Sequence, residues 1–291
     1  MTTESSVRLA WRVTEPLHAM IYFAPEAFRR FADLGLSPME GYFASRGAVF
    51  GAAGPGPVIA TFYNFHPGLV RRVLPAVWER TTPAAALDAR MSGADEALRR
   101  GLGDVGTAEI VEAAGLARRA AESATEFPQG RPLFAAHAGL PWPAEPHLQL
   151  FQAQTLLREF RGDGHVSALL LAGLTGLEAN VLQVATGRVP RVFLQETRGW
   201  SDDEWAAATD SLRTRGLVSS EEPGTITEAG QALLADLEAT TDRLAEPGWA
   251  VLGEQGRLRL AELTRPLSRA VVKAGMLDPM NLVKAARNGA P

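Results

Sequence analysis

The sequence predicts a mainly α-helical fold made of two similar halves, and three observations lead to this expectation. Apolar residues recur at spacings of three and four along most of the chain, which is the period of a helix that buries one face. A segment rich in proline and glycine interrupts this pattern near the middle of the chain. The regions on either side of it share a sequence pattern at one constant offset.

Seven stretches have the clearest helical period, and they lie on both sides of the interruption. They are residues 24–36, 67–81, 94–102, 107–124, 148–160, 201–217 and 227–245. Polar N-caps followed by proline or an acid mark helix starts at Ser37, Thr82 and Ser201. Short β-ribbons are expected only at residues 100–110 and 215–227, where glycines and polar residues separate helical stretches.

Residues 126–145 contain the proline- and glycine-rich interruption, and we place the junction between the halves there. The N-terminal half is then residues 1–125 and the C-terminal half residues 146–291. Leucine, phenylalanine and tryptophan residues within the junction predict that it packs against both halves.

Two aligned segments suggest that the halves are copies of one another. Residues 74–78 align with residues 189–193, and at the same offset residues 86–102 align with residues 201–217. Both of the longer segments end in Arg-Gly-Leu. Helices rich in alanine and leucine also align by chance, so a chance match is the alternative to an internal duplication.

Composition restricts the classes of protein to which the chain can belong. A net charge of −4, with 46% hydrophobic and 21% charged residues, is typical of a folded, soluble protein. The weakly acidic balance disfavours binding to nucleic acid phosphates, which usually requires a local excess of lysine and arginine. The absence of cysteine excludes disulfides, thiolate zinc sites, iron–sulfur clusters and a cysteine nucleophile.

We expect a cytoplasmic monomer or homodimer that does not enter a membrane. The first residues lack the basic region and apolar run of a secretory signal. The longest apolar run, residues 166–185, has about the length of a membrane span but carries Glu178, Asn180 and Gln183. A buried helix pair is the better prediction for this run.

Residues 190–250 resemble the winged helix of MarR-type regulators. A helix ending in Leu-x-x-Arg-Gly-Leu-Val is followed by a short acidic stretch and by residues 225–234, which correspond to the recognition helix, the wing and the next helix. Gly216 suits a positive φ at the helix end, and Gly230 would let the next helix pack closely. The resemblance implies a winged-helix-like unit in the second half and, through the alignment, in the first.

The DNA-facing parts of this unit lack the side chains that read DNA. A recognition helix presents Arg, Lys, Asn or Gln from its first turns. The corresponding turns and wing here carry a serine and five acids: Ser201, Asp202, Asp203, Glu204, Glu221 and Glu222. Arg213 and Arg215, at the helix end, are the only candidates for DNA contacts, and they have structural alternatives.

The wider chain resembles an actinobacterial helix-turn-helix family whose members are labelled MarR-like or uncharacterised. The similarity rests on residues 41–51, 60–78, 156–179 and 197–205 and covers nearly the whole length. It implies a winged-helix architecture without a transferable active site. The position of some relatives near specialised-metabolite genes suggests a role in secondary metabolism.

The first candidate site lies in residues 156–170, which we predict to form two helices joined by a tight turn. Four polar side chains surround the predicted turn: Glu159, Arg161, Asp163 and His165. Asp163 would accept a hydrogen bond from His165 and form an acid–base pair with it. In the structural alternative, Asp163 caps the second helix, Arg161 pairs with Glu159, and His165 fills a half-buried position.

The second candidate site is the aromatic stretch at residues 61–68. It places Asn64 and His66 beside Tyr63 and two phenylalanines, a composition that suits a pocket for a flat organic ligand and equally a core turn. Arg46 is the predicted partner for a carboxylate or phenolate on such a ligand.

No metal or cofactor site is predicted. The five histidines are scattered without the spacing of metal ligands, and they are His18, His66, His137, His147 and His165. Phosphate-binding glycine loops and nucleophile elbows are also absent from the sequence.

Three functions are compatible with these features. The leading hypothesis is a repurposed winged-helix scaffold that binds a small aromatic or polyketide-like molecule between its halves, as a tailoring enzyme or binding protein of secondary metabolism. The alternative is a MarR-like, ligand-responsive regulator that binds DNA, which the acidic surface disfavours. The third is a protein-interaction module that uses this acidic surface.

Overall fold

A computed structural model of the chain describes residues 5–221, 224–279 and 281. Throughout this part of the chain, the secondary structure consists of helices, turns and one isolated antiparallel bridge. The predicted mainly α-helical class is therefore confirmed. The division into two halves and the internal duplication stay predictions.

Seven α-helices precede the predicted junction. They are α1 (Ser6–Ala19), α2 (Pro25–Ala32), α3 (Pro38–Gly47), α4 (Pro55–Thr61), α5 (Pro67–Arg80), α6 (Pro83–Leu102) and α7 (Ala108–Ala124). The remaining α-helices are α8 (Pro132–Ala138), α9 (Pro146–Leu171), α10 (Gly176–Ala185), α11 (Arg191–Arg198), α12 (Asp202–Thr214), α13 (Glu228–Trp249) and α14 (Gly253–Lys273). Short 3₁₀ turns are η1 (Met20–Tyr22), η2 (Ala48–Phe50) and η3 (Ala250–Leu252).

The predicted N-caps form as expected. The side chains of Ser37, Thr82 and Ser201 each accept a hydrogen bond from the backbone N–H three residues ahead. At Ser37 and Ser201 a glutamate completes a reciprocal capping box, which satisfies a further backbone donor.

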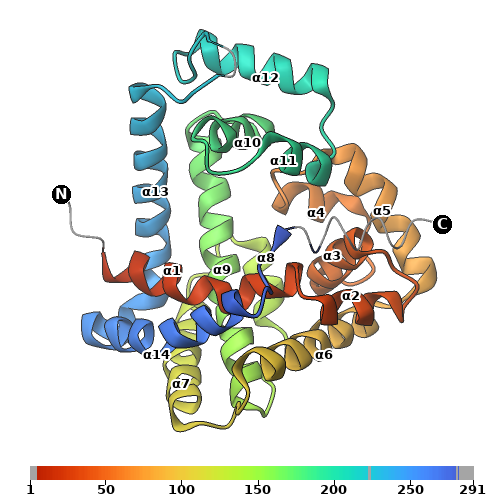
Figure 1. Cartoon of the computed structure of the whole chain (residues 1–291), viewed down its shortest axis with the longest axis vertical. Coiled ribbons are helices and arrows are strands. Elements are labelled where there is room, and N and C mark those ends of the chain that lie inside the picture. Colours follow the sequence, from red (N-terminus) through yellow and green to blue (C-terminus); the bar gives the residue numbers. More distant parts are fainter. Residues whose placement is uncertain (1–4, 222–223, 280, 282–291) are drawn as a thin grey trace.

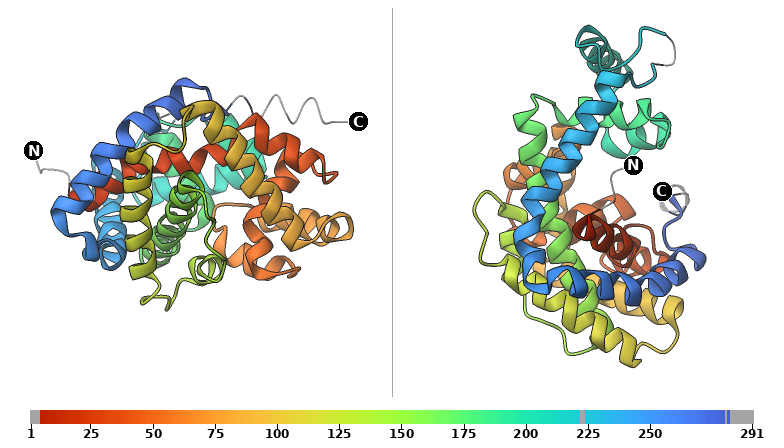
Figure 2. Two further views of the ribbon diagram at one scale, coloured as in Figure 1. Left: turned by 90° about the horizontal axis from the view of Figure 1, so that it is seen from below. Right: turned by 90° about the vertical axis from the view of Figure 1, so that its left-hand side faces the viewer.

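Helix α9 is the central element of the fold (Figure 1). It packs against α7, α8, α13 and α1, while α14 lies along α1 (Figure 2). The larger hydrophobic core surrounds α9 and includes Phe43, Phe134, Phe160 and Trp249. A smaller core begins at the C-terminal end of α9, because Ala168 and Leu169 there pack with residues of α10 and α12.

Helices α10, α11 and α12 form a three-helix unit at this end of α9 (Figure 1). A short turn joins α11 to α12, and Gly199 at the end of α11 has a φ of 78°. This arrangement of two helices and a glycine-containing turn is a helix-turn-helix. The predicted roles of two other glycines are confirmed, because Gly216 has a φ of 69° and a Cβ on Gly230 would lie 2.3 Å from the Leu217 carbonyl oxygen.

Neither predicted β-ribbon forms a strand in the described residues. Around residues 215–227 the β-pairing of the described backbone is limited to one bridge between Val218 and Ile226. The Thr225 N–H donates to the Ser219 hydroxyl instead of to a backbone carbonyl. Glu222 lies outside the described residues. Residues 100–110 instead form the end of α6, a turn and the start of α7, where Asp104 accepts from the Gly106 N–H. The predicted β-wing is therefore not supported.

The predicted break after residue 160 is wrong, because α9 continues through it to Leu171. Gly164 serves helix packing instead of a turn. A Cβ on Gly164 would lie 2.9 Å from an Arg131 nitrogen and 3.2 Å from the Leu244 Cβ. The absence of a side chain thus lets α13 and the junction approach α9 closely.

The junction at residues 126–145 contains α8 and packs on the central helix. Arg131 donates to the carbonyl oxygens of Phe160 in α9 and Leu244 in α13, while Leu133 and Phe134 are buried in the larger core. These contacts hold the segment against both helices.

Within the described residues, a single helix with the length and apolarity needed to cross a membrane is not found. Helices α9 and α10 reach those limits only as a pair that is bent by 95°.

We predict that Gly176→Ala destabilises the attachment of the three-helix unit. An added Cβ would lie 1.9 Å from the Tyr63 carbonyl oxygen, so the free energy of unfolding should fall by about 2–3 kcal/mol. Gly115→Ala is the matched control, because its Cβ would point into open space on α7 and should raise stability by up to about 1 kcal/mol. Urea denaturation measures both changes, and equal effects would contradict the close approach.

Candidate functional site

Seven of the eight predicted catalytic and ligand-binding residues line one cavity of about 300 Å³. They are Arg46, Tyr63, Asn64, Glu159, Arg161, Asp163 and His165. Residues of α1, α3, α9, α11 and α13 form the walls, together with the segment after α4. The cavity therefore lies between the larger core and the three-helix unit, and both sides of the predicted junction contribute to it.

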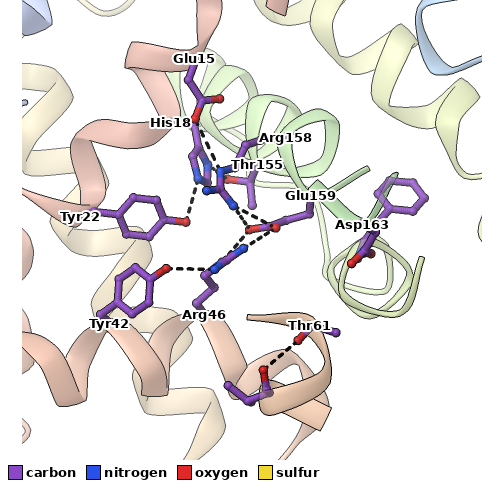
Figure 3. Close-up of polar contacts among 12 residues, drawn as sticks. Glu15, His18, Tyr22, Tyr42, Arg46, Thr61, Thr155, Arg158, Glu159 and Asp163 are labelled. Atoms are coloured by element: carbon purple, nitrogen blue, oxygen red, sulfur yellow. Dashed lines mark hydrogen bonds and ion pairs between the residues drawn. The ribbon is translucent and has the colours of Figure 1, made fainter. Parts of the chain in front are cut away.

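The carboxylate of Glu159 lies between two arginines at the wall of this cavity (Figure 3). Arg46 donates to both of its oxygens, at 2.9 and 2.8 Å, and Arg158 donates to both at 3.1 Å. Burial raises the pKa of Glu159, but the charges of Arg46 and Arg158 outweigh this effect and hold the pKa well below its usual value. Glu159 is therefore a buried, ionised structural acid.

Arg46 is also fixed by aromatic side chains. Its Nη1 donates to the Tyr42 hydroxyl at 3.0 Å, and its guanidinium carbon lies 4.2 Å from the centroid of the Phe62 ring. Every nitrogen of the Arg46 guanidinium has a carboxylate or hydroxyl partner within the protein. Arg46 is therefore a weaker candidate for binding an anionic group of a ligand than the sequence suggests.

Arg161 joins α9 to α13 and α1. It pairs with Glu238 at 2.9 Å and Asp242 at 3.1 Å, both of which also pair with Arg8, and it stacks over Trp11. The alternative ion pair between Arg161 and Glu159 is wrong, because the continuous helix directs the Arg161 side chain toward α13.

Asp163 and His165 do not form the expected hydrogen bond. Residues two apart in a helix point in different directions, and Asp163 instead accepts from the Phe134 N–H at 2.9 Å. It therefore caps α8 from a neighbouring helix and does not cap α9. Burial raises the pKa of Asp163 to about 6.

His165 has one ring nitrogen fixed and one available. The Thr241 hydroxyl donates its proton to the Leu237 carbonyl, so His165 Nδ1, 3.0 Å away, must donate to Thr241. Nε2 then carries a lone pair, and the described residues offer it no hydrogen-bond partner. Burial lowers the pKa of His165, so the imidazole is neutral near pH 7 and Nε2 can accept a proton or hydrogen bond.

Tyr63 and Asn64 attach the cavity wall to the three-helix unit. The Tyr63 hydroxyl donates to the Leu174 carbonyl at 2.6 Å. The Asn64 carbonyl accepts from the side chains of Asn180 and Trp200, each at 3.0 Å. The aromatic residues of this segment line the cavity, while the Tyr63 hydroxyl and the Asn64 carbonyl hold α10 and the α11–α12 turn.

His66 lies outside the cavity, unlike the other predicted ligand-binding residues. Its Nδ1 accepts from the Gly68 N–H at the start of α5, so Nε2 carries the proton and donates to Glu204 of α12 at 3.1 Å. An edge-to-face contact with Trp200 completes its surroundings. His66 therefore links α5 to α12.

Arg198 is the main cavity residue that the sequence analysis missed. It ends α11, and its guanidinium carbon lies 4.3 Å from the Phe65 ring centroid. Within the described chain the guanidinium makes one hydrogen bond, to the Thr197 hydroxyl at 3.2 Å. None of the described carboxylates lies within ion-pair distance of it. Burial lowers the pKa of Arg198. Other missed lining residues are Trp11, Glu15, Tyr42, Arg158 and Glu238.

The described residues contain no group of three or more His, Asp or Glu side chains placed to hold a metal ion.

The first turn of α12 presents mainly acids to solvent. Asp202 and Asp203 are exposed, and Asp202 accepts from Arg191 of the preceding helix. One carboxylate oxygen of Glu204 accepts from the Ser201 N–H, and the other accepts from His66. The side chains at the usual position for DNA contacts are therefore negatively charged.

The two arginines at the end of α12 have structural contacts. Arg213 donates to the Ser219 carbonyl at 3.1 Å, which holds the hairpin that follows. Arg215 donates to the Gly173 and Ala172 carbonyls at 3.1 and 3.2 Å, which caps the end of α9. Binding DNA through these side chains would compete with contacts within the protein.

A family model described as a helix-turn-helix family matches residues 7–278. The chain belongs to this helix-turn-helix family. The match extends over both the larger core and the three-helix unit, so the likeness to the family is not limited to the α11–α12 turn. Comparison with curated proteins and with solved structures gives no significant match.

We predict that Glu159→Gln destabilises this helix-turn-helix protein by about 3–5 kcal/mol, because it leaves two guanidinium groups without their buried counter-charge. Glu122→Gln breaks an exposed ion pair with Arg118 and should change stability by about 0.5 kcal/mol or less. Urea denaturation at pH 7 compares the two. Similar small losses would contradict the structural role of Glu159.

Asp163→Asn should change how stability depends on pH. The folded chain protonates Asp163 near pH 6 and the unfolded chain near pH 4, so its contribution to the free energy of unfolding falls as pH rises between these values, by up to about 3 kcal/mol. The stability difference, wild type minus Asp163→Asn, should therefore decrease from pH 4 to pH 7. A flat or increasing difference in urea denaturation would contradict the raised pKa.

Proposed function

We propose that this helix-turn-helix protein binds a small organic anion with a flat aromatic body in the cavity between the larger core and the three-helix unit. The observation that carries the proposal is the cation at Arg198. It faces a cavity in which the other arginines already have carboxylate partners among the described residues.

The charges around the cavity favour an anionic group on the ligand. Arg46 and Arg158 neutralise Glu159, and Arg161 shares Glu238 with Arg8. Arg198 has no carboxylate within ion-pair distance among the described residues, and a partly buried cation of this kind is stabilised by a carboxylate or phenolate. The ligand would thus supply the charge that the protein lacks.

The walls and the volume favour an aromatic body. Trp11, Phe62, Tyr63 and Phe65 line the cavity, and about 300 Å³ is the lower end of the range for small-molecule sites. A compact aromatic or polyketide-like acid fits these conditions, in agreement with a binding protein or tailoring enzyme of secondary metabolism. For a reaction in this site, Nε2 of His165 is the group that would accept a proton.

Binding in this cavity would act directly on the helix-turn-helix. Arg198 is the last residue of α11, and its carbonyl accepts from the His66 N–H at 2.8 Å. Trp200 and Glu204 contact the same segment after α4. A ligand held between Arg198 and the aromatic segment would therefore influence how α11 and α12 lie on the core.

A MarR-like, ligand-responsive DNA-binding regulator is the second candidate, and membership of the helix-turn-helix family favours it. The acids of α12 and the structural contacts of Arg213 and Arg215 weigh against it. A mobility-shift assay with DNA from upstream of its own gene separates the two. A specific shift that weakens steeply with salt would support the regulator.

We predict that Arg198→Met weakens binding of naphthalene-2-carboxylate, used as an aromatic anion probe, by about 10-fold or more, because it removes a charge-assisted hydrogen bond. Binding of uncharged 2-naphthylmethanol should change by less than about 3-fold. Calorimetric titration measures both.

Arg191→Met is the matched control, since Arg191 lies on the same helix but is exposed and pairs with Asp202. It should leave the affinity for both probes unchanged. Equal losses in the two variants, or no binding of either probe to the wild type, would overturn the proposed anion site.

A further inference from the structure

A second, smaller cavity of about 50 Å³ lies between α6, α8 and α9. All nine residues that line it are buried or half-buried, and none of them lines the larger cavity. Its polar members are Arg90 of α6, His137 of α8, and Gln152 and Thr155 of α9, and the side chains of the last two donate to backbone carbonyl oxygens. A cavity of this size admits a small ion or a few water molecules and excludes organic ligands.

Arg90 is a buried cation without a counter-charge in the described part of the chain. It is 4% exposed, and none of the described carboxylates lies within ion-pair distance. Both terminal nitrogens, Nη1 and Nη2, are buried without a hydrogen-bond partner. Its guanidinium carbon lies 5.5 Å from the ring centroids of Tyr22 and Phe151. These cation–π contacts offset only part of the free energy lost when a charge is buried.

His137 adds a third unsatisfied nitrogen beside the same cavity. It is 2% exposed, and its Nε2 has no hydrogen-bond partner among the described residues. Burial lowers the pKa of His137 to about 3, so the ring is neutral at physiological pH and can donate one N–H from Nε2. Glu159, whose charge opposes this effect, is already bound by Arg46 and Arg158.

The unsatisfied groups share one chemical preference. A guanidinium has only hydrogen-bond donors, and the neutral imidazole can carry its proton on Nε2. The three nitrogens can therefore all donate to a hydrogen-bond acceptor in the cavity. Water can accept these hydrogen bonds, but it cannot compensate the buried charge of Arg90. An anion does both.

We propose that this cavity binds one monovalent inorganic anion of about the size of chloride, held by Arg90 and His137. The anion neutralises Arg90 and joins α6 to α8 beside the central helix. Its effect is on the folded core, independent of any organic ligand in the larger cavity.

Thermal unfolding of the full chain tests the proposal in sodium bromide, with sodium gluconate keeping the ionic strength constant. The wild-type midpoint should rise by about 5 °C when bromide reaches about 100 times its Kd, and it should keep rising with the logarithm of the bromide concentration. Arg90→Met should lose at least four-fifths of this shift. Arg99→Met, which removes an exposed arginine of the same helix, should keep it.

Diffraction from wild-type crystals grown with bromide provides a measurement that does not depend on a variant folding. An anomalous peak within hydrogen-bond distance of Arg90 and His137, together with the midpoint shift that depends on Arg90, supports the site. Water density there without a bromide peak overturns it. A peak without a shift of the wild-type midpoint in solution means binding at crystal concentration only and also overturns it, as does an equal bromide response in Arg90→Met.

Discussion

The buried charge of Glu159 is the constraint on which the arrangement around the cavity depends. At 1% exposure, this carboxylate can be ionised only because Arg46 from α3 and Arg158 from its own helix both donate to it. Arg158 in turn lies 3.6 Å from Glu15 of α1. A charge that needs partners from separate helices fixes how those helices meet, and the cavity forms beside this meeting point.

Most charged side chains near the cavity pair with one another, so a cation that does not pair points to an anionic ligand. Arg161 and Arg8 share Glu238 and Asp242, whereas in the described part of the chain the guanidinium of Arg198 contacts the Phe65 ring and one hydroxyl. Since Arg198 ends α11, the unbalanced cation lies at the contact between the core and the helix-turn-helix. A ligand there would act on the orientation of α11 and α12, whichever macromolecule or reaction the protein serves.

Local sequence signals predicted the local structure well. The helical period, the three N-caps and the glycines Gly216 and Gly230 needed only neighbouring residues, and the structure agrees with each. Arg46 and Glu159 belong to separate candidate sites in the sequence, because their pairing joins positions 113 residues apart and follows from packing. Gly164 was misinterpreted as part of a turn because the close approach of α13 has no local signature. Arg198 was missed for the same reason, since its environment comes from the distant Phe65.

Native mass spectrometry of the protein purified from its natural host, before and after denaturation, tests the central claim most directly. The account predicts a non-covalent adduct of a small organic acid that is present in the native spectrum and released on denaturation. Its loss from an Arg198→Met variant prepared in the same way would place it in the cavity. A wild-type protein that carries no such adduct, and that instead retards DNA from upstream of its own gene specifically, would contradict the account.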